Sequence, residues 1–88
     1  RQQPQAVDTT PQVRITAGVN LRAGPGTDFA VVGSARVDQR LPVLGRAQRN
    51  GEVWYEVQDL DNAFKWVRSD FVELENINAS DLPLTGGG

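Results

Sequence analysis

Apolar and polar residues alternate over short stretches in the middle of the chain, a pattern typical of half-buried β-strands. The clearest stretch is 53–58, where Tyr55 lies between two valines on one face and Trp54 begins the opposite face. The alternation and the turn residues between stretches predict short strands at residues 13–16, 19–22, 31–35, 40–47, 53–58, 64–68 and 72–74.

Two turn sequences stand out between these stretches. Asn50-Gly51 predicts a two-residue type I′ hairpin, because both central positions of that turn need positive φ. Gly24-Pro25-Gly26 predicts a tight turn. It does not fit a phosphate-binding loop, which needs a helix N-terminus behind it.

Residues 60–74 are ambiguous on local evidence. Apolar residues recur there at helical spacing, and Asp59 is a suitable N-cap. Trp66 and Val72 fall outside that stripe, however, and aromatic and β-branched residues favour strands. Propensity alone leaves helix and strand open for this stretch.

The two ends of the chain differ in composition from its middle. Residues 1–12 are rich in Gln and Pro, which predicts a linker, and residues 76–88 end in three glycines, which predicts a flexible tail. All three Phe, both Trp and the single Tyr lie between them. We therefore expect one small domain over residues 13–75.

The chain has no His, Cys or Met, so nucleophilic mechanisms that need imidazole or thiolate and the common zinc sites are excluded. Carboxylate chemistry or binding remains. The acidic residues cluster around turns, and a chain this small builds no deep cleft to shift their pKa values. Asp59, Asp61 and Asn62 have an oxygen-rich spacing but lack the rest of a calcium loop. We expect no enzyme activity, no metal and no cofactor.

Charge and hydropathy narrow the range of partners. The net charge of −2 does not indicate a basic surface for binding nucleic acid. The longest apolar run, residues 29–32, is too short for a membrane helix. We expect a monomer with no nucleic-acid partner and no membrane insertion.

Four motifs resemble those of a known family, and they occur in the same order along the chain. The run from Val19-Asn-Leu-Arg-Ala-Gly-Pro-Gly to Gly33 resembles the opening of bacterial SH3-like (SH3b) domains. Arg40-Leu-Pro-Val-Leu-Gly, Trp54-Tyr-Glu-Val and Trp66-Val-Arg-Ser-Asp-Phe-Val resemble the family's later strands. The chain departs from the pattern at Lys65, where the family usually has Gly, and at 37–39, where it usually has a Lys-Gly turn.

The resemblance implies an all-β, small SH3-like barrel of five to seven short antiparallel strands, flanked by disordered termini. It also implies strand, then a short helical turn at residues 69–71, then strand, for the ambiguous stretch. Its functional implication is a non-catalytic binding module of a bacterial extracytoplasmic protein, directed to cell-wall peptidoglycan or its peptide bridges. The alternative is a structural or regulatory spacer that packs on a neighbouring domain of its parent chain or mediates protein–protein contacts.

A shallow aromatic groove is the expected binding site. Trp54 lies on the outer face of its strand, where it either covers the barrel or forms a platform for a ligand. The candidate groove residues are Asn20, Asp28, Phe29, Trp54, Trp66, Arg68 and Phe71, although Trp66 and Phe29 also suit the core. Arg22 is expected to hold Asp28 or loop carbonyls.

Residues 82–86, Leu-Pro-Leu-Thr-Gly, resemble the LPxTG signal by which sortases attach proteins to Gram-positive cell walls. A linker or a purification tag would account for the same five residues.

Overall fold

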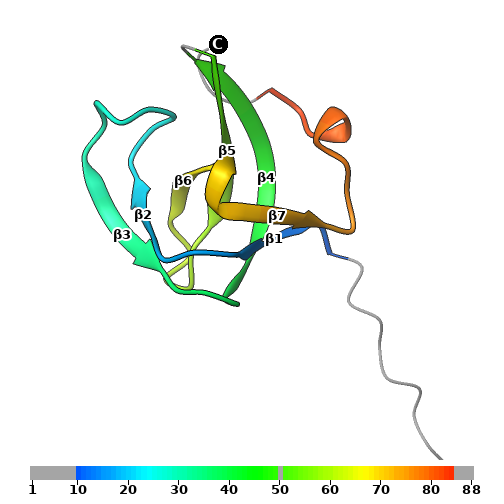
Figure 1. Cartoon of the computed structure of the whole chain (residues 1–88), viewed down its shortest axis with the longest axis horizontal. Helices are drawn as coiled ribbons and strands as arrows, with labels where there is room; N and C mark the ends of the chain where they lie inside the picture. Colours follow the sequence, from blue (N-terminus) through cyan, green and yellow to red (C-terminus); the bar gives the residue numbers. More distant parts are fainter. Residues whose placement is uncertain (1–9, 50, 85–88) are drawn as a thin grey trace, which may run out of the picture.

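The computed structural model shows a seven-stranded antiparallel sheet that curls into a small barrel (Figure 1). It describes residues 10–49 and 51–84. In chain order the elements are β1 (Gln12–Ile15), β2 (Val19–Arg22), β3 (Val31–Ala35), β4 (Arg40–Arg49), β5 (Glu52–Gln58), β6 (Phe64–Arg68), the 3-10 turn η1 (Ser69–Phe71), β7 (Val72–Glu75) and the 3-10 turn η2 (Ala79–Asp81). The strand order is β3-β2-β6-β5-β4-β1-β7. The predicted all-β class is confirmed.

The ambiguous stretch forms strand β6, the turn η1 and strand β7, as the family resemblance implies. The helical stripe is not a buried face, because Leu60 is 81% exposed and Phe64 is 59% exposed. Strand β6 pairs along its whole length with β5, from Gln58 opposite Phe64 to Trp54 opposite Arg68. Tertiary pairing therefore decides between two local patterns of similar strength.

Strands β4 and β5 form the longest hairpin of the sheet. Arg49 is opposite Glu52, so the connection has the two residues that the sequence predicts, and Gly51 has a φ of 79°. Asn50 lies outside the described residues. Beyond the turn, Ala47 is opposite Trp54, which places a small side chain beside a large one.

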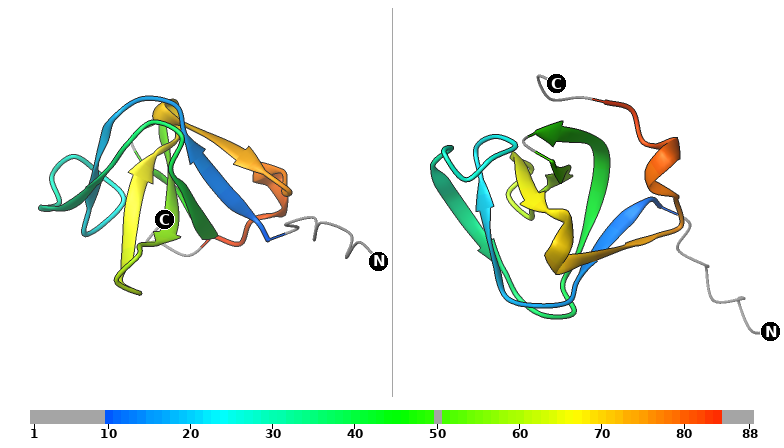
Figure 2. Two further views of the ribbon diagram at one scale, coloured as in Figure 1. Left: turned by 90° about the horizontal axis from the view of Figure 1, so that it is seen from below. Right: turned by 45° about the horizontal axis from the view of Figure 1, so that its top comes forward.

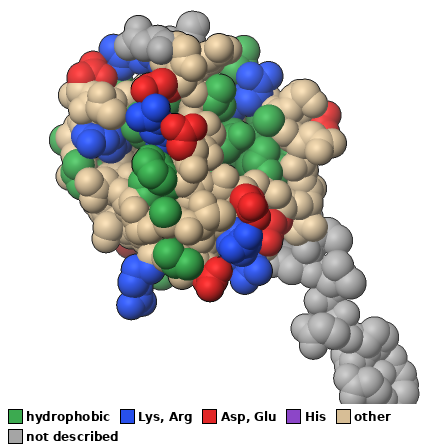
Figure 3. Space-filling model, viewed as in Figure 1, with side chains coloured by type: hydrophobic (Ala, Val, Ile, Leu, Met, Phe, Trp, Pro, Cys, Tyr) green, Lys and Arg blue, Asp and Glu red, His purple; other side chains and the backbone are tan. Residues whose placement is uncertain are grey.

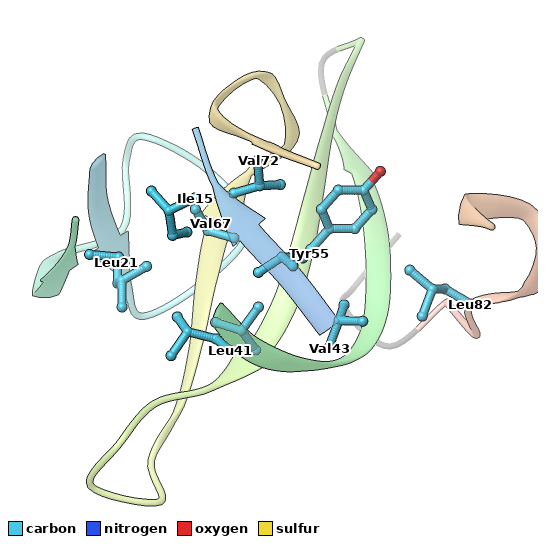
Figure 4. Close-up of a cluster of buried hydrophobic side chains, with 11 residues drawn as sticks. Ile15, Leu21, Leu41, Val43, Tyr55, Val67, Val72 and Leu82 are labelled. Atoms are coloured by element: carbon cyan, nitrogen blue, oxygen red, sulfur yellow. The ribbon is translucent and has the colours of Figure 1, made fainter. Parts of the chain in front are cut away.

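The core fills the inside of the barrel with side chains from most of its strands (Figure 4). Alternation places Tyr55 and Val57 of β5 and Val67 of β6 on this inner face. The core cluster consists of Val13, Ile15, Leu21, Ala35, Leu41, Val43, Tyr55, Val57, Val67, Val72 and Leu82. A second, smaller cluster of Ala47, Trp54 and Trp66 lies on the other face of β4, β5 and β6.

The segment after β7 begins the stretch 76–88, for which the sequence predicts a flexible tail. Residues 76–84 lie against the barrel, and the orange-red segment in Figures 1 and 2 runs back to β4. Leu82 is 4% exposed within the core cluster, and the Arg46 amide donates to the Pro83 carbonyl at 2.8 Å. One buried leucine and one backbone bridge order a segment whose composition predicts disorder. Residues 85–88 lie outside the described range.

At the other end of the domain, residues 11 and 12 also contact the barrel. Gln12 begins β1, and its side-chain amide donates to the Glu75 carboxylate at 2.9 Å. The Pro11 carbonyl accepts a hydrogen bond from the Val43 amide at 3.0 Å. Residues 1–9 lie outside the described range.

Both departures from the family pattern have local compensation. Asp38 adopts a φ of 70°, a conformation that glycine favours, and its carboxylate accepts a hydrogen bond from Arg14 at 3.2 Å. Lys65 is buried, and its ammonium lies 2.6 Å from the Asp59 carboxylate and 3.3 Å from that of Asp61. A Cβ on Gly33 would come within 3.1 Å of the same ammonium, so that glycine leaves room for the lysine.

Charged side chains of both signs lie beside one another on the face shown in Figure 3. Glu75 of β7 has two arginine partners: its carboxylate lies 2.8 Å from Arg40 and 3.6 Å from Arg14. The hydrogen bond from Arg40, followed by that from Gln12, lowers the pKa of the Glu75 carboxyl below its ordinary value. These contacts connect β1, β4 and β7 at one end of the sheet.

Substituting Leu82→Ala is expected to lower the free energy of unfolding by roughly 2–5 kcal/mol, because it leaves a cavity in the core. Urea unfolding followed by far-UV circular dichroism measures the change. Leu84→Ala is the matched control: Leu84 is exposed, and its loss should cost at most about 0.5 kcal/mol. Equal effects of the two substitutions would contradict the docking of residues 76–84.

The lowered pKa of Glu75 makes its contribution to stability depend on pH. The contribution is present above the ordinary carboxyl pKa and is lost as pH falls through the lower pKa of the folded state. Glu75→Gln should therefore be less stable than wild type at neutral pH, and the difference should shrink at about pH 3. Urea unfolding at both pH values measures it, with Glu56→Gln as a control that removes a carboxylate for which the described residues provide no ion pair. A difference that stayed constant with pH would exclude this role for Glu75.

Candidate binding groove

A hollow of about 210 Å³ lies on the face of the sheet opposite to the core. It is bordered by β2, the β2–β3 loop, β5, β6 and η1. Its lining residues are Gly18, Val19, Asn20, Arg22, Thr27, Trp54, Arg68 and Phe71. We refer to this set as the groove.

Strand register explains why residues distant in sequence meet in the groove. Arg22 of β2 is opposite Trp66 of β6, and Arg68 of β6 is opposite Trp54 of β5. Side chains two residues apart in a strand share a face, so Asn20 and Arg22 lie on the same side of the sheet as both tryptophans.

Trp54 lines the groove while being almost completely buried, with 2% of its surface exposed. Its indole packs with Trp66 and Ala47, and the indole N–H has no hydrogen-bond acceptor within the part of the chain that the structure describes. Tryptophan N–H groups buried in proteins usually have a partner. Trp54 points to the outer face of the sheet, as predicted. Its side chain is nevertheless buried and mainly covers that face of the sheet.

Phe71 supplies the exposed aromatic surface of the groove. It ends η1, the turn between β6 and β7, and 36% of its surface is exposed. Its carbonyl accepts a hydrogen bond from the Thr16 amide at 2.8 Å. That backbone contact holds the turn against the loop after β1 and keeps the ring at the edge of the hollow.

The two arginines of the groove differ in their ion pairs. Arg68 lies 2.9 Å from the Glu52 carboxylate and 3.0 Å from that of Asp70, so its charge is balanced. Arg22 instead donates from one terminal nitrogen to the carbonyls of Thr27 at 3.1 Å and Phe29 at 2.9 Å. Among residues 10–49 and 51–84, Arg22 has no acidic partner. Its predicted role in holding the loop carbonyls is confirmed.

The β2–β3 loop, residues 23–30, is tied to the end of β4 beside the groove. Arg49 pairs with the Asp28 carboxylate at 3.1 Å, and its guanidinium lies 5.2 Å from the centre of the Phe29 ring. The same ring lies over Gly24, where a Cβ would approach it to 2.5 Å. Glycine is therefore required at this position for the ring to pack on the loop backbone.

The structure divides the seven predicted site residues into two groups. Asn20, Trp54, Arg68 and Phe71 line the groove together. The others lie outside its lining: Asp28 and Phe29 in the loop contact with Arg49, and Trp66 buried in the small cluster with Trp54.

Four further residues line the groove in addition to those predicted from the sequence: Gly18, Val19, Arg22 and Thr27. Arg22 could be predicted from the sequence, because it lies two residues after Asn20 in the same strand and therefore on the same face. Gly18 and Thr27 lie in connections, whose positions only the fold determines.

A second hollow, about 450 Å³, lies at the β3–β4 turn and is lined by Arg36, Val37, Asp38, Gln39 and Leu60. It is larger but has no aromatic side chain and is formed mostly by one turn. The groove is therefore the better candidate for recognition.

The oxygen-rich residues Asp59 and Asp61 have a structural role, because both hold the buried ammonium of Lys65. A backbone hydrogen bond from Ala63, ahead of the contact with Lys65, lowers the pKa of the Asp61 carboxyl. Within the described ranges no group of three or more acidic side chains is arranged to hold a metal ion. No helix in those ranges is long and apolar enough to span a membrane.

The first three residues of the LPxTG-like motif are part of the folded structure. Leu82 is buried, and Leu84 forms a parallel bridge with Arg46 of β4. An enzyme that reads this motif would have to remove Leu82 from the core. Thr85 and Gly86 lie outside the described residues.

A family model described as "Bacterial SH3 domain" matches residues 17–73 of the chain. The match covers more than half of the sequence, and the chain therefore belongs to the bacterial SH3 domain family. Searches of the curated proteins and of the solved structures found no significant match. Domains of this family are generally non-catalytic binding modules and are often associated with the cell wall or the cell envelope.

Replacing Arg49 tests whether its contact with Asp28 and Phe29 holds the loop. Arg49→Ala should speed hydrogen exchange at the Ala23 and Phe29 amides, while the free energy of unfolding falls by at most about 1 kcal/mol. Exchange measured by NMR reports the change residue by residue. Arg36→Ala, an exposed arginine without an ion pair in the described ranges, should leave the loop amides unchanged. Unaltered exchange in Arg49→Ala would mean that the loop does not depend on this contact.

Proposed function

We propose that this domain is a non-catalytic targeting module of a bacterial extracytoplasmic protein and that its groove binds a peptide of cell-wall peptidoglycan. The observation that carries the proposal is the groove itself, in which an exposed aromatic ring and several polar side chains surround one hollow on a bacterial SH3 domain. Pockets that combine apolar surface with a few converging polar groups are the usual sites for small ligands.

An extended peptide suits this arrangement. Phe71 offers a ring face for an apolar side chain, while Asn20 and Thr27 offer polar atoms to the peptide backbone. The loop contact with Arg49 keeps the groove formed before the ligand arrives, which lowers the entropy cost of binding. The hollow is small, so a single domain binds weakly, and a linker to another domain raises the effective concentration at the wall.

A second candidate function is a spacer that packs on a neighbouring domain of its parent protein. The observation in its favour is the edge strand β3, where the consecutive residues Val31 and Val32 are both exposed. A sheet edge with exposed apolar side chains is a suitable surface for pairing with another chain. This surface lies outside the groove lining, so substitutions can separate the two functions.

Co-sedimentation with purified peptidoglycan tests the targeting function. Wild-type protein should pellet with the insoluble wall, and Phe71→Ala should reduce the bound fraction at least several-fold, because the ring face is lost. Phe64→Ala is the matched control: Phe64 is a more exposed phenylalanine that does not line the groove. The folded state of each variant is checked by circular dichroism.

Wild-type protein that stays in the supernatant with walls of differing peptide composition would refute cell-wall targeting. Equal loss of binding in the two phenylalanine variants would move the binding site away from the groove. Loss of binding in Val32→Lys with none in Phe71→Ala would favour the edge strand β3 as the interacting surface.

A further inference from the structure

We infer that the groove recognises the free carboxylate at the C-terminal end of a short peptide, with Arg22 as its principal partner. This inference rests on the proposed function, because it specifies the chemistry of the peptide bound in the same groove. Charge, hydrogen-bonding capacity and size each support it.

The only charged side chains that line the groove are positive, although the whole chain carries a net charge of −2. Its lining contains two arginines and no acidic residue. Glu52 and Asp70 balance Arg68, whereas Arg22 has no acidic partner among residues 10–49 and 51–84. An anionic ligand would therefore meet one arginine whose guanidinium has no ion pair in the described ranges.

The hydrogen bonds of Arg22 also orient its guanidinium. One terminal nitrogen donates to the carbonyls of Thr27 and Phe29, which fixes the plane of the group. Within the described ranges its other nitrogens have no acceptor. A guanidinium held in this way can present two parallel N–H groups to a carboxylate, the geometry that makes arginine–carboxylate pairs strong and specific.

Neutral donors around the groove complete the site. The side chains of Asn20 and Thr27 have no hydrogen-bond partner among the described residues, and both line the groove. The N–H of Trp54, which is more than nine-tenths buried in the same wall, also has no acceptor in these ranges. The donors of Asn20 and Thr27 are exposed and have no competing acidic group in the lining, so they favour a ligand that brings acceptors.

The size of the groove favours the end of a peptide over its middle. The hollow of about 210 Å³ is below the roughly 300 Å³ at which typical ligand pockets begin. It suits a terminal residue with its carboxylate, while the preceding residue lies against the exposed ring of Phe71. The carboxylate therefore belongs to a chain end rather than to an acidic side chain within a longer segment.

Three synthetic probes test this chemistry by NMR titration of the intact chain. They are N-acetyl-trialanine, its C-terminal amide, and N-acetyl-Ala-Glu-Ala amide, which carries a carboxylate only in its side chain. We expect N-acetyl-trialanine to shift the resonances of Asn20, Arg22 and Trp54 and to bind at least fivefold more tightly than either other probe. Equal binding of the free acid and its amide would overturn the carboxylate inference, and equal or tighter binding of the glutamate probe would overturn the choice of a chain end.

Charge substitutions at Asn20 provide the second measurement. Asn20 is exposed, so both variants should fold. Asn20→Asp places a carboxylate beside Arg22 and should weaken binding of N-acetyl-trialanine roughly fivefold, whereas Asn20→Lys should strengthen it. Asn78→Asp makes the same chemical change outside the groove and should leave binding unchanged. An unaltered affinity in both Asn20 variants would exclude a charge-based role for the groove.

These results remain distinguishable from a failure of the proposed function. If wild-type protein pellets with peptidoglycan but binds none of the three probes, the carboxylate inference is wrong and cell-wall targeting stands. If N-acetyl-trialanine binds as expected but no wall preparation retains the protein, the groove recognises peptide ends from another source. The absence of both signals would refute both proposals.

Discussion

The pairing of β5 with β6 positions both the core and the groove. Each strand contributes side chains to both faces of the sheet, so one set of backbone hydrogen bonds positions two different surfaces. Tyr55 and Val67, which are opposite one another, enter the core, while Trp54 and Arg68 point to the groove. A shift of one residue in this register would exchange the two surfaces, and burial of the core face prevents it.

The groove is built on this rigid pair and bordered by less regular segments. Trp54 and Trp66 pack with Ala47 and cover the sheet. This packing holds the two indole rings in place beneath the groove. Exposed residues of η1 and of the β2–β3 loop border the groove, and that loop is held by Arg22 through the Phe29 carbonyl and by Arg49 through the Asp28 carboxylate. A binding surface of this kind combines a stable floor with a border that sequence changes can alter without unfolding the barrel.

The strands up to β5 are predictable because apolar and polar residues alternate along them and turn-forming residues separate them, whereas β6 and β7 are predictable only from the family resemblance. The predicted strands differ from β1 to β7 by at most two residues at any end. The site was predictable only in part. Trp54 and Phe71 were found from face alternation and family resemblance, but Thr27 and Gly18 lie in connections that have no periodic pattern. The burial of Leu82 was missed for a related reason, since one leucine in a polar segment carries no periodic signal.

The strands up to residue 58 and the exclusion of imidazole and thiolate chemistry follow from the local pattern and the composition of the sequence. The all-β class follows from the sequence only together with its family resemblance, because residues 60–74 have no decisive local pattern. Tertiary structure decided which residues become neighbours. The fold places Glu52 and Asp70 beside Arg68, where both form ion pairs with it, and places no acidic side chain of the described residues beside Arg22. Tertiary contacts also pack residues 76–84 against the barrel. Pairing and burial act between residues far apart in the chain, so no local pattern could specify them.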